Sequence, residues 1–243
     1  MEEFLYEHFY KIENEHWWFA ARQNILREFM EKKLRLAPGI KLLDVGCGTG
    51  AILDMFSKRY EAYGQDVSAQ AVEFCRKRGL TRVVQGTLDR LPPDYKDFDF
   101  ATLLDVLEHI DNDRGALREV RSLLKPGGRV LITVPAFPAL WGAHDVVTHH
   151  KRRYVSATVT EVVTGAGFTV EHIWYFNFFL FPVAWVRRKI AKLTRTSDAN
   201  DMDVPAKPVN GVLRSVFEFE KHLLPNMKFP FGLSLICVAR RDA

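Results

Sequence analysis

The sequence predicts an α/β fold in which the strands of a parallel sheet alternate with helices. The first observation is an apolar run at Leu42–Val45, which is typical of a short buried strand. The second is three glycines at alternating positions, Gly46, Gly48 and Gly50, which lead into a helix-like segment at 51–58. The third is that further strand-like runs follow, separated by segments with helical spacing or helix caps. This alternation indicates a sheet covered by helices.

Residues 1–38 precede the first strand and are expected to form an N-terminal helical segment. The stretch 24–30 has helical spacing, and a Pro-Gly pair at 38–39 ends the segment. Before that stretch stand two adjacent tryptophans, Trp17 and Trp18, which cannot both face one side of a helix. Two roles remain open for the aromatic residues here: packing of the first helix on the sheet, or covering a ligand.

The rest of the chain continues the alternation. Ser68 is expected to cap the start of one helix, which Gly79 ends, and Lys125–Gly128 is a stop signal for a later helix. In chain order, the sequence predicts strands at 61–66, 82–86, 97–104, 129–135, 168–175 and 233–240, and helices at 69–78, 114–124, 156–165 and 212–224.

The glycine turn is compatible with two classes of nucleotide ligand, because Gly46-x-Gly48-x-x-Ala51 also fits a dinucleotide fingerprint. Glycines leave room for a ligand against bare main chain, and the N–H groups of the following helix face that ligand. In a dinucleotide site a pyrophosphate would lie here, and the carboxylate of Asp44 would repel it. S-adenosylmethionine (SAM) carries a sulfonium and an ammonium group, which the same carboxylate would attract. Asp66 ends the next strand and suits ribose hydroxyls in either class.

At this point the chain resembles the class I SAM-dependent methyltransferases, whose first motif reads like Leu43–Gly50. Residues 85–92 resemble the Gly-Asp-x-x-x-Leu-Pro motif of the ubiquinone/menaquinone-biosynthesis-like (type 11/12) small-molecule methyltransferases, and the Leu-Glu-His at 107–109 resembles the end of their fourth-strand signature. The resemblance covers about residues 40–170. It implies a Rossmann-like seven-stranded sheet of order 3-2-1-4-5-7-6, with an antiparallel last strand and helices on both faces. An inserted helical cap, which lies outside the resemblance, completes the expected fold.

The resemblance also implies a SAM site, from which S-adenosylhomocysteine (SAH) would leave as product. Thr87 stands where relatives have the Asp that binds the adenine amino group, so this acceptor stays open between Thr87 and Asp89. Arg22 is a candidate partner for the SAM carboxylate, and Trp18 or Phe19 is a candidate lid over SAM. Cys47 is expected to be a small pocket residue rather than a nucleophile. The expected cofactor-binding residues are Asp44, Gly46, Cys47, Gly48, Asp66, Val67, Thr87, Leu88, Leu104, Asp105, Arg22 and Trp18.

Methyl transfer to a hydroxyl requires a base for the hydroxyl proton, and histidine suits this task near neutral pH. His144 beside Asp145 resembles a His-Asp pair that follows strand five in quinone-biosynthesis O-methyltransferases; a loop held by hydrogen bonds is the alternative. The candidate catalytic residues are His144, Asp145, His149 and His109, and the candidates for holding a phosphate or carboxylate of the acceptor are Arg152, Arg153 and Tyr154.

A divalent metal is a further alternative at the turn after the fourth strand. Asp105, Glu108 and His109 resemble the Glu-x-x-Glu-His set with which some relatives hold a divalent cation, although the first Glu is Asp here. Roles in structure or in SAM positioning are favoured over a metal for these three residues.

The long stretch between the last two predicted strands indicates an inserted cap. Residues 173–186 are aromatic and apolar but too few to span a bilayer, and basic residues follow at 187–195. Such a segment suits an interfacial helix, a pocket for a long apolar substrate, or a cap packed on the domain. Residues 197–210 are polar, with two prolines, and are expected to be a linker.

Composition favours one domain over the 243 residues, with a 1–38 lid segment, a 40–175 SAM-binding core and a 176–230 cap and linker. Apolar and charged contents of 47% and 26% are ordinary for a globular protein, and the net charge of +4 does not by itself call for nucleic acid. Three widely spaced cysteines and an acidic N-terminus favour a cytoplasmic protein with reduced thiols, with peripheral membrane contact through 173–195 as an option.

The expected function is transfer of a methyl group from SAM to a small or lipid-linked acceptor, at oxygen rather than at another atom. The alternatives are an RNA methyltransferase that uses the basic cap, a SAM- or SAH-binding regulator without catalysis, and an NAD enzyme. The oligomeric state stays open.

Overall fold

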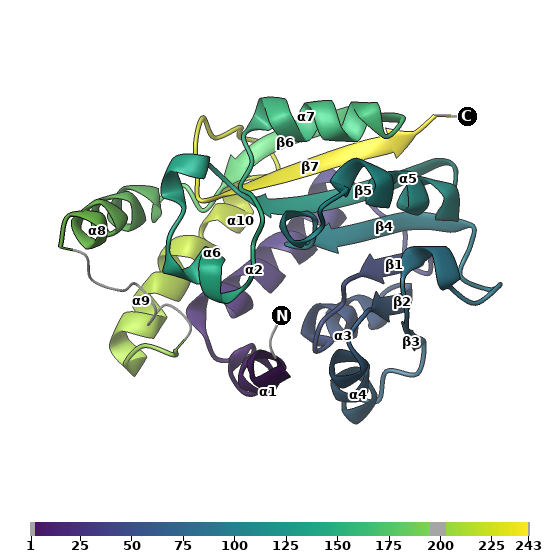
Figure 1. The fold of residues 1–243 in the computed structure, drawn as a ribbon, viewed down its shortest axis with the longest axis horizontal. Coiled ribbons are helices and arrows are strands. Elements are labelled where there is room, and N and C mark those ends of the chain that lie inside the picture. The colour runs from purple at the N-terminus through teal and green to yellow at the C-terminus, as the bar shows by residue number, and fades with distance from the viewer. Residues whose placement is uncertain (1–2, 195–202, 243) are drawn as a thin grey trace.

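The computed structural model describes residues 3–194 and 203–242 and contains a seven-stranded sheet between helices (Figure 1). The strand order is β3-β2-β1-β4-β5-β7-β6. Strands β1 to β5 pair in parallel, whereas β7 runs antiparallel to both β5 and β6. These findings confirm the predicted order and the antiparallel last strand.

The strands are β1 (Lys41–Val45), β2 (Glu61–Asp66), β3 (Val83–Gln85), β4 (Phe98–Leu104), β5 (Leu124–Pro135), β6 (Phe168–Phe176) and β7 (Ser234–Arg241). The α-helices are α1 (Glu3–Ile12), α2 (Trp17–Glu28), α3 (Ala51–Ser57), α4 (Ala69–Lys77), α5 (Asp113–Leu123), α6 (Ala143–Val147), α7 (Ser156–Gly165), α8 (Phe181–Thr194), α9 (Lys207–Glu218) and α10 (Glu220–Leu223). A π-helical turn at Phe29–Lys33 extends α2.

The core lies on both faces of the sheet, because the central strands turn apolar side chains to each side. On one face, Leu42 and Leu131 pack with residues of α2, α3, α4 and α9 such as Ile25. On the other face, Leu43 and Ile132 pack with α5 and α7. Burial on both faces explains why the strands read as continuous apolar runs in the sequence.

Three elements differ from the expected ones. β5 begins at Leu124, where Leu124 pairs with Phe98 before a register shift, so the stop signal at 125–128 lies inside the strand. The helix expected at 212–224 is two helices, α9 and α10, which meet at Phe219. The aromatic segment is divided, because residues 173–176 complete β6 and α8 begins at 181.

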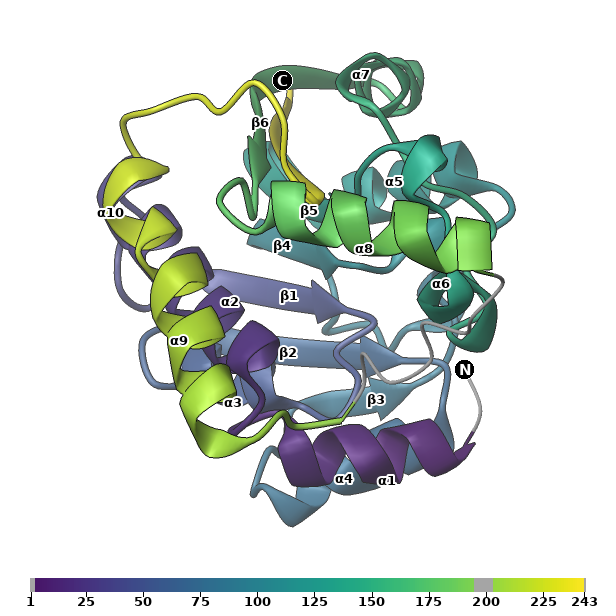
Figure 2. The ribbon, with the colours of Figure 1, turned by 90° about the vertical axis from the view of Figure 1, so that its left-hand side faces the viewer.

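Helices α1, α6, α8 and α9 lie on the side of the molecule toward which the arrowheads of β1 and β4 point (Figure 1), and α8 crosses the front of the turned view (Figure 2). The edge at which the parallel strands β1 and β4 end is therefore covered by segments from both ends of the chain. Of the expected linker, residues 197–202 lie outside the described residues, as does Arg195 of the basic cluster. Within 3–194 and 203–242, every helix falls short of the length and apolar content that crossing a membrane requires.

Candidate functional site

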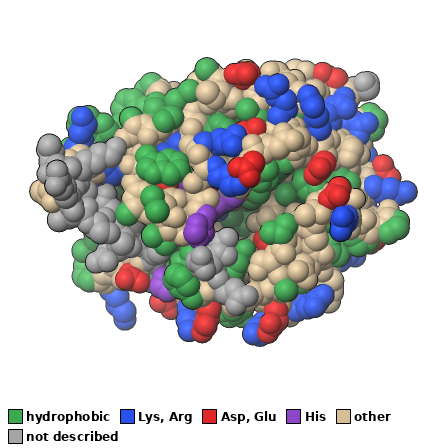
Figure 3. Space-filling model, viewed as in Figure 1, with side chains coloured by type: hydrophobic (Ala, Val, Ile, Leu, Met, Phe, Trp, Pro, Cys, Tyr) green, Lys and Arg blue, Asp and Glu red, His purple; other side chains and the backbone are tan. Residues whose placement is uncertain are grey.

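A cavity of about 560 Å³ lies beside the glycine turn, at the edge where the parallel strands end. Its walls come from α1 and α2, the turns after β1 and β4, α6 with the loop that follows, and α8. Histidine side chains are visible beside a hollow near the middle of the face shown in Figure 3. Ligands of open α/β sheets bind at this edge.

The cavity gathers many, though not all, of the residues predicted from the sequence. Those that line it are Trp18, Arg22, Asp44, Gly46, Cys47, Gly48, Leu104, Asp105, His109 and His144. Those that are not among its lining residues are Asp66, Val67, Thr87, Leu88, Asp145 and His149.

The glycine turn brings bare main chain to the cavity. Gly46, Gly48 and Gly50 all have positive φ angles, of 66°, 55° and 87°, which side chains rarely adopt. A Cβ atom on Gly46 would also lie 2.7 Å from Cγ2 of Val106. Both conformation and space therefore require glycine at the first position of the turn.

Asp44 places an acidic group beside this turn. Its carboxylate is buried and accepts a hydrogen bond of 2.6 Å from Oγ1 of Thr102. Burial raises the pKa of Asp44 to about 7, against the opposing effect of the Thr102 hydrogen bond. A cationic ligand would favour the ionised carboxylate, whereas a pyrophosphate would oppose it. The site therefore suits a ligand with an ammonium group at this point.

Helix α2 carries Arg22 into the cavity wall. The guanidinium is buried, lies over the Trp18 ring at 4.9 Å and donates to Oγ1 of Thr133 at 3.1 Å. It also forms an ion pair of 2.5 Å with Asp105, a residue with a φ of 58° in the turn after β4. Asp105 and Thr133 hold the guanidinium, and its Nε is buried without a hydrogen-bond partner among the described residues, so Arg22 keeps a donor for a ligand carboxylate.

The residues expected to bind the adenosine part of SAM do not line the cavity. Asp66 accepts hydrogen bonds of 2.9 Å from the backbone N–H groups of Gly48 and Ser68, so its carboxylate braces the glycine turn. Thr87 is hydrogen-bonded to the exposed Asp89, and Val67 faces solvent. The adenine acceptor stays a prediction.

Sequence reasoning missed Glu13, which ties the N-terminal segment to the glycine turn. The carboxylate of Glu13 accepts a 2.6 Å hydrogen bond from Oγ1 of Thr49 and pairs with Arg78 at the end of α4. Tyr10 lies over the Arg78 guanidinium and stacks on Phe74 of α4. No local sequence signal singles out this contact, because its members are far apart along the chain.

The histidine cluster is built differently from the His144–Asp145 pair suggested by the sequence. Asp145 is fully buried and contacts His150, whose Nδ1 lies 2.8 Å from its Oδ1. His144 and Asp145 are neighbours on the short helix α6 and point apart, because adjacent helical residues do not face each other. The chain returns along Asp145 at 150–153, so that His150 lines the cavity and His149 does not.

Asp145 fixes which nitrogen of His150 faces the cavity. Burial alone would raise the pKa of Asp145, but the hydrogen bond with His150 and the charge of Arg153 hold it well below its usual range. An ionised carboxylate only accepts hydrogen bonds, so Nδ1 of His150 carries a proton. Nε2 is then the ring nitrogen that can accept a proton or bind a metal.

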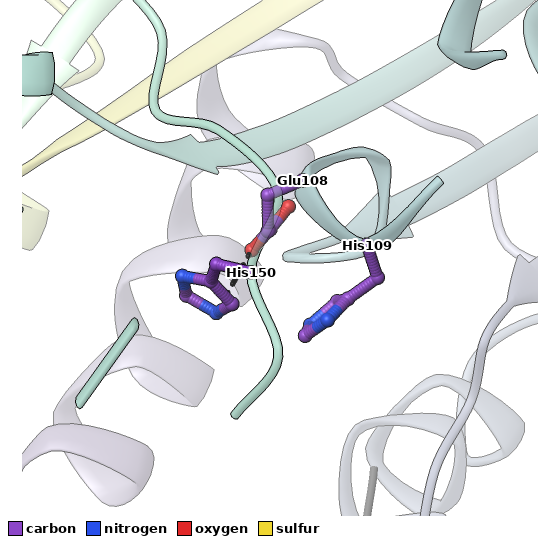
Figure 4. A group of neighbouring side chains, drawn as sticks. All are labelled: Glu108, His109 and His150. Carbon is purple, nitrogen blue, oxygen red and sulfur yellow. Dashed lines mark ion pairs between the residues drawn. The ribbon is translucent and has the colours of Figure 1, made fainter. Parts of the chain in front are cut away.

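Glu108, His109 and His150 form a compact group (Figure 4). One ligand atom from each lies within 4.8 Å of the others, and Nε2 of His150 lies 3.9 Å from Oε1 of Glu108. Burial, and next the charge of Asp105, raises the pKa of Glu108 well above its usual value. Burial, followed by the charge of His150, lowers the pKa of His109 to about 4, so that its ring is neutral near pH 7.

This group differs by one residue from the metal-binding set considered from the sequence. His150 takes the place of Asp105, because the Asp105 carboxylate pairs with Arg22. Within the described part of the chain, neither carboxylate oxygen of Glu108 has a hydrogen-bond partner. A buried acceptor without a donor beside two imidazole rings fits a divalent cation.

The basic residues after the cluster are held by protein carboxylates rather than presented to an acceptor. Arg152 pairs with Asp113 at 3.0 Å, and the buried Tyr154 donates to the same carboxylate at 2.9 Å. Arg153 donates to Asp145 at 2.7 Å. Arg152 and Tyr154 are not among the residues that line the cavity, whereas Arg153 lines it while paired. That these groups hold a phosphate or carboxylate of the acceptor stays a prediction.

Comparison with known proteins agrees with the geometry. A methyltransferase-domain family matches residues 43–132. The chain is 26% identical over 220 residues to a ubiquinone biosynthesis O-methyltransferase from Xanthomonas euvesicatoria, covering 79% of this chain and 89% of that one. It is 37% identical over 105 residues to the ubiquinone/menaquinone biosynthesis C-methyltransferase UbiE from Idiomarina loihiensis, covering 39% and 42%.

Coverage varies among the relatives. An uncharacterized protein from Methanocaldococcus jannaschii is 29% identical over 117 residues, which make up 48% of this chain and 55% of that one. The fold matches the crystal structure of a SAM-dependent methyltransferase from Mesorhizobium loti, with a TM-score of 0.59, 17% identity and coverage of 94% of this chain and 100% of that one. Together with the glycine turn and its acidic neighbour, these matches support a SAM-dependent methyltransferase with the class I fold and SAM as its cofactor, and the chain is similar to the ubiquinone/menaquinone-biosynthesis methyltransferases.

Proposed function

We propose that the protein transfers the methyl group of SAM to a hydroxyl oxygen of a small or lipid-linked acceptor, with His150 as the general base. The observation that carries this proposal is the 2.8 Å contact between Nδ1 of His150 and the buried Asp145, which leaves Nε2 available in the cavity wall. The similarity to an O-methyltransferase over 89% of that chain's length supports oxygen as the acceptor atom.

The proposed step moves one proton and one methyl group. The acceptor hydroxyl gives its proton to Nε2 of His150, and Asp145 stabilises the imidazolium that forms. The acceptor oxygen attacks the methyl carbon in line with the sulfur, the carbon–sulfur bond breaks, and SAH leaves as a neutral thioether. Because the sulfonium is already activated, most of the enzyme's contribution is positioning.

We assign the SAM end of the cavity to the glycine turn, with Asp44 toward the ammonium group and Arg22 toward the carboxylate. The N-terminal segment 1–38 acts as a lid in this proposal. Support comes from Trp18 and Tyr6, which line the cavity, and from Glu13, which joins the segment to Thr49 of the glycine turn. The turn of main chain that holds SAM is thus also the point where the segment is attached.

Asp66→Ala is expected to weaken SAH binding by about 1–3 kcal/mol, because the backbone N–H groups of Gly48 and Ser68 lose their acceptor and the glycine turn loses its brace. Calorimetric titration with SAH measures the effect. Glu73→Ala is the matched control, because Glu73 is an exposed carboxylate on α4 that pairs with Lys77. Equal affinities of Asp66→Ala and the wild type would remove Asp66 from the SAM site.

A divalent cation is the second candidate for activating the acceptor, and the unpartnered carboxylate oxygens of Glu108 favour it. Glu108, His109 and His150 would hold the ion, whose chemistry is to polarise the acceptor hydroxyl and lower its pKa. Glu108 would then be ionised, with its charge balanced by the ion.

Removal of divalent cations separates the two candidates. We expect conversion of SAM to SAH to continue after treatment with a chelator, because His150 alone supplies the base. Loss of activity with the chelator, followed by recovery on adding Mg²⁺ or Mn²⁺, would replace His150 as free base by the metal. The assay uses labelled SAM with fractions of a cell extract as the source of acceptor, and formation of SAH in any fraction tests the function itself.

We also propose that residues 173–195 contact a membrane surface, from which a lipid-linked acceptor would come. A lipid-linked acceptor resides at a membrane surface, and this segment combines aromatic and basic residues.

A further inference from the structure

Helix α8 turns apolar side chains outward as well as toward the cavity. Among its described side chains, those at 181–190 and 194, none is buried. Val183, Trp185, Val186 and Ile190 are exposed by 63%, 44%, 48% and 54%. An apolar helix that buries so little of itself leaves a face for another surface to cover.

The charge on the same segment indicates what that surface is. Arg187, Arg188 and Lys189 follow the exposed Trp185 and Val186, and 173–195 contains no acidic residue. Arg187 and Arg188 border the cavity, so the exposed Lys189 is the basic residue of the three that stands among the outward apolar side chains. An anionic lipid surface takes both kinds of group, because the headgroups attract the basic side chains while the apolar ones enter the boundary with the acyl chains. RNA would match the charge but leave the apolar side chains in water.

The other side of α8 forms part of the cavity wall. Ala184, Arg187 and Arg188 line the cavity, together with Leu180 just before the helix. Arg188 also donates to the backbone oxygen of Leu140, which connects α8 to the segment before α6. One helix therefore borders both the outer surface and the cavity that receives the acceptor.

The turn that leads into α8 is firmly held. The buried carboxylate of Glu220 accepts hydrogen bonds from the backbone N–H groups of Asn177, Phe178 and Phe179, at 2.6, 2.7 and 3.1 Å. Three hydrogen bonds to one buried carboxyl group fix the start of α8 relative to β6 and α10. The helix therefore presents its outer face in a defined orientation.

We propose that α8 docks on an anionic membrane surface through Trp185, Val186, Lys189 and Ile190, and that the docked helix lets an amphiphilic acceptor pass from that surface into the cavity. The docking stands on the exposed face and charge of α8 alone. The acceptor route rests on the proposed methyl transfer.

Co-sedimentation with vesicles tests the docking without any need for catalysis. We expect the full chain to bind vesicles of phosphatidylcholine mixed with phosphatidylglycerol, to bind phosphatidylcholine vesicles far less, and to bind less tightly as salt is raised. Lys189→Glu should weaken binding about fivefold or more, because each basic group near such a surface contributes about 1 kcal/mol. Trp185→Asp should also weaken binding, through loss of apolar contact.

Matched controls carry the same changes at other exposed places. Val212→Asp on α9 and Lys58→Glu after α3 should bind vesicles as the wild type does. Equal binding of the wild type to both vesicle types, or unchanged binding of Lys189→Glu and Trp185→Asp, would overturn the proposal. The proposal would also be overturned if the protein did not bind vesicles but bound single-stranded RNA or a second copy of the chain through α8. Loss of that binding in Trp185→Asp would show that α8 is the site.

The same variants separate this inference from the proposed function. If the wild type converts SAM to SAH but does not bind the anionic vesicles, the docking of α8 is wrong and methyl transfer stands. If it binds the vesicles through α8 but no extract fraction yields SAH, the proposed function is wrong and the docking stands.

Discussion

His150→Ala is expected to lower the turnover of SAM about 100- to 10,000-fold, which is the range that a positioned general base contributes. The cause is the loss of Nε2, the nitrogen that the contact between Nδ1 and Asp145 leaves available for the acceptor proton. SAH affinity should be little changed, because the glycine turn and Asp44 stay intact. Turnover is measured as SAH formed from labelled SAM, and affinity by calorimetry.

The control is His172→Ala, which removes an imidazole on β6 beside Trp174, away from the cavity. It should leave turnover close to that of the wild type. Thermal unfolding of both variants shows whether either is misfolded. Wild-type turnover by a folded His150→Ala protein would rule out this residue as the base.

Glu220→Ala is expected to lower the free energy of unfolding by about 3 kcal/mol or more. The change leaves three backbone N–H groups at 177–179 without their acceptor, and each such loss in a buried position costs roughly 1–3 kcal/mol. This is a large fraction of the roughly 5–15 kcal/mol that stabilises a domain. Denaturant unfolding measures it.

Glu218→Ala is the matched control, because Glu218 lies near the surface with Arg214 and Lys221 as partners. Exposed pairs of this kind contribute up to about 1 kcal/mol. If the two variants lost equal stability, the carboxylate of Glu220 would not be the support of the turn before α8.

Burial also makes the contribution of Glu220 depend on pH. It raises the pKa of Glu220 to about 7, against the opposing hydrogen bonds from residues 177–179, whereas the usual value is 4.5. The native state therefore keeps its proton at pH values where the unfolded chain has lost it. The stability that results is complete below about pH 4.5 and declines as the pH rises to 7. Glu220→Gln should lack this decline.

Local patterns predicted the fold well. The apolar run at 42–45, the glycines after it and the caps at Ser68 and Gly79 each specify a strand, a turn or a helix through interactions among neighbours in the chain. Long-range contacts decided the elements that differ. β5 starts at Leu124 because that residue pairs with Phe98, which the stop signal at 125–128 does not reveal.

The site residues could be predicted where they belong to one continuous motif. They could not be predicted where the chain folds back to bring separate residues together. Asp44 and Gly46 belong to one motif and line the cavity together. Asp145 is paired with His150 through a chain reversal, so sequence adjacency favoured His144 instead. Glu13 in the N-terminal segment contacts Thr49, and no pattern of residue spacing in the sequence predicts this contact.

The most direct measurement of the central claim is a crystal structure of the protein with SAH bound. The account predicts SAH in the cavity, with its amino group at Asp44, its carboxylate toward Arg22 and its sulfur facing the space bordered by His150. SAH bound elsewhere, or with its sulfur turned away from His150, would contradict it.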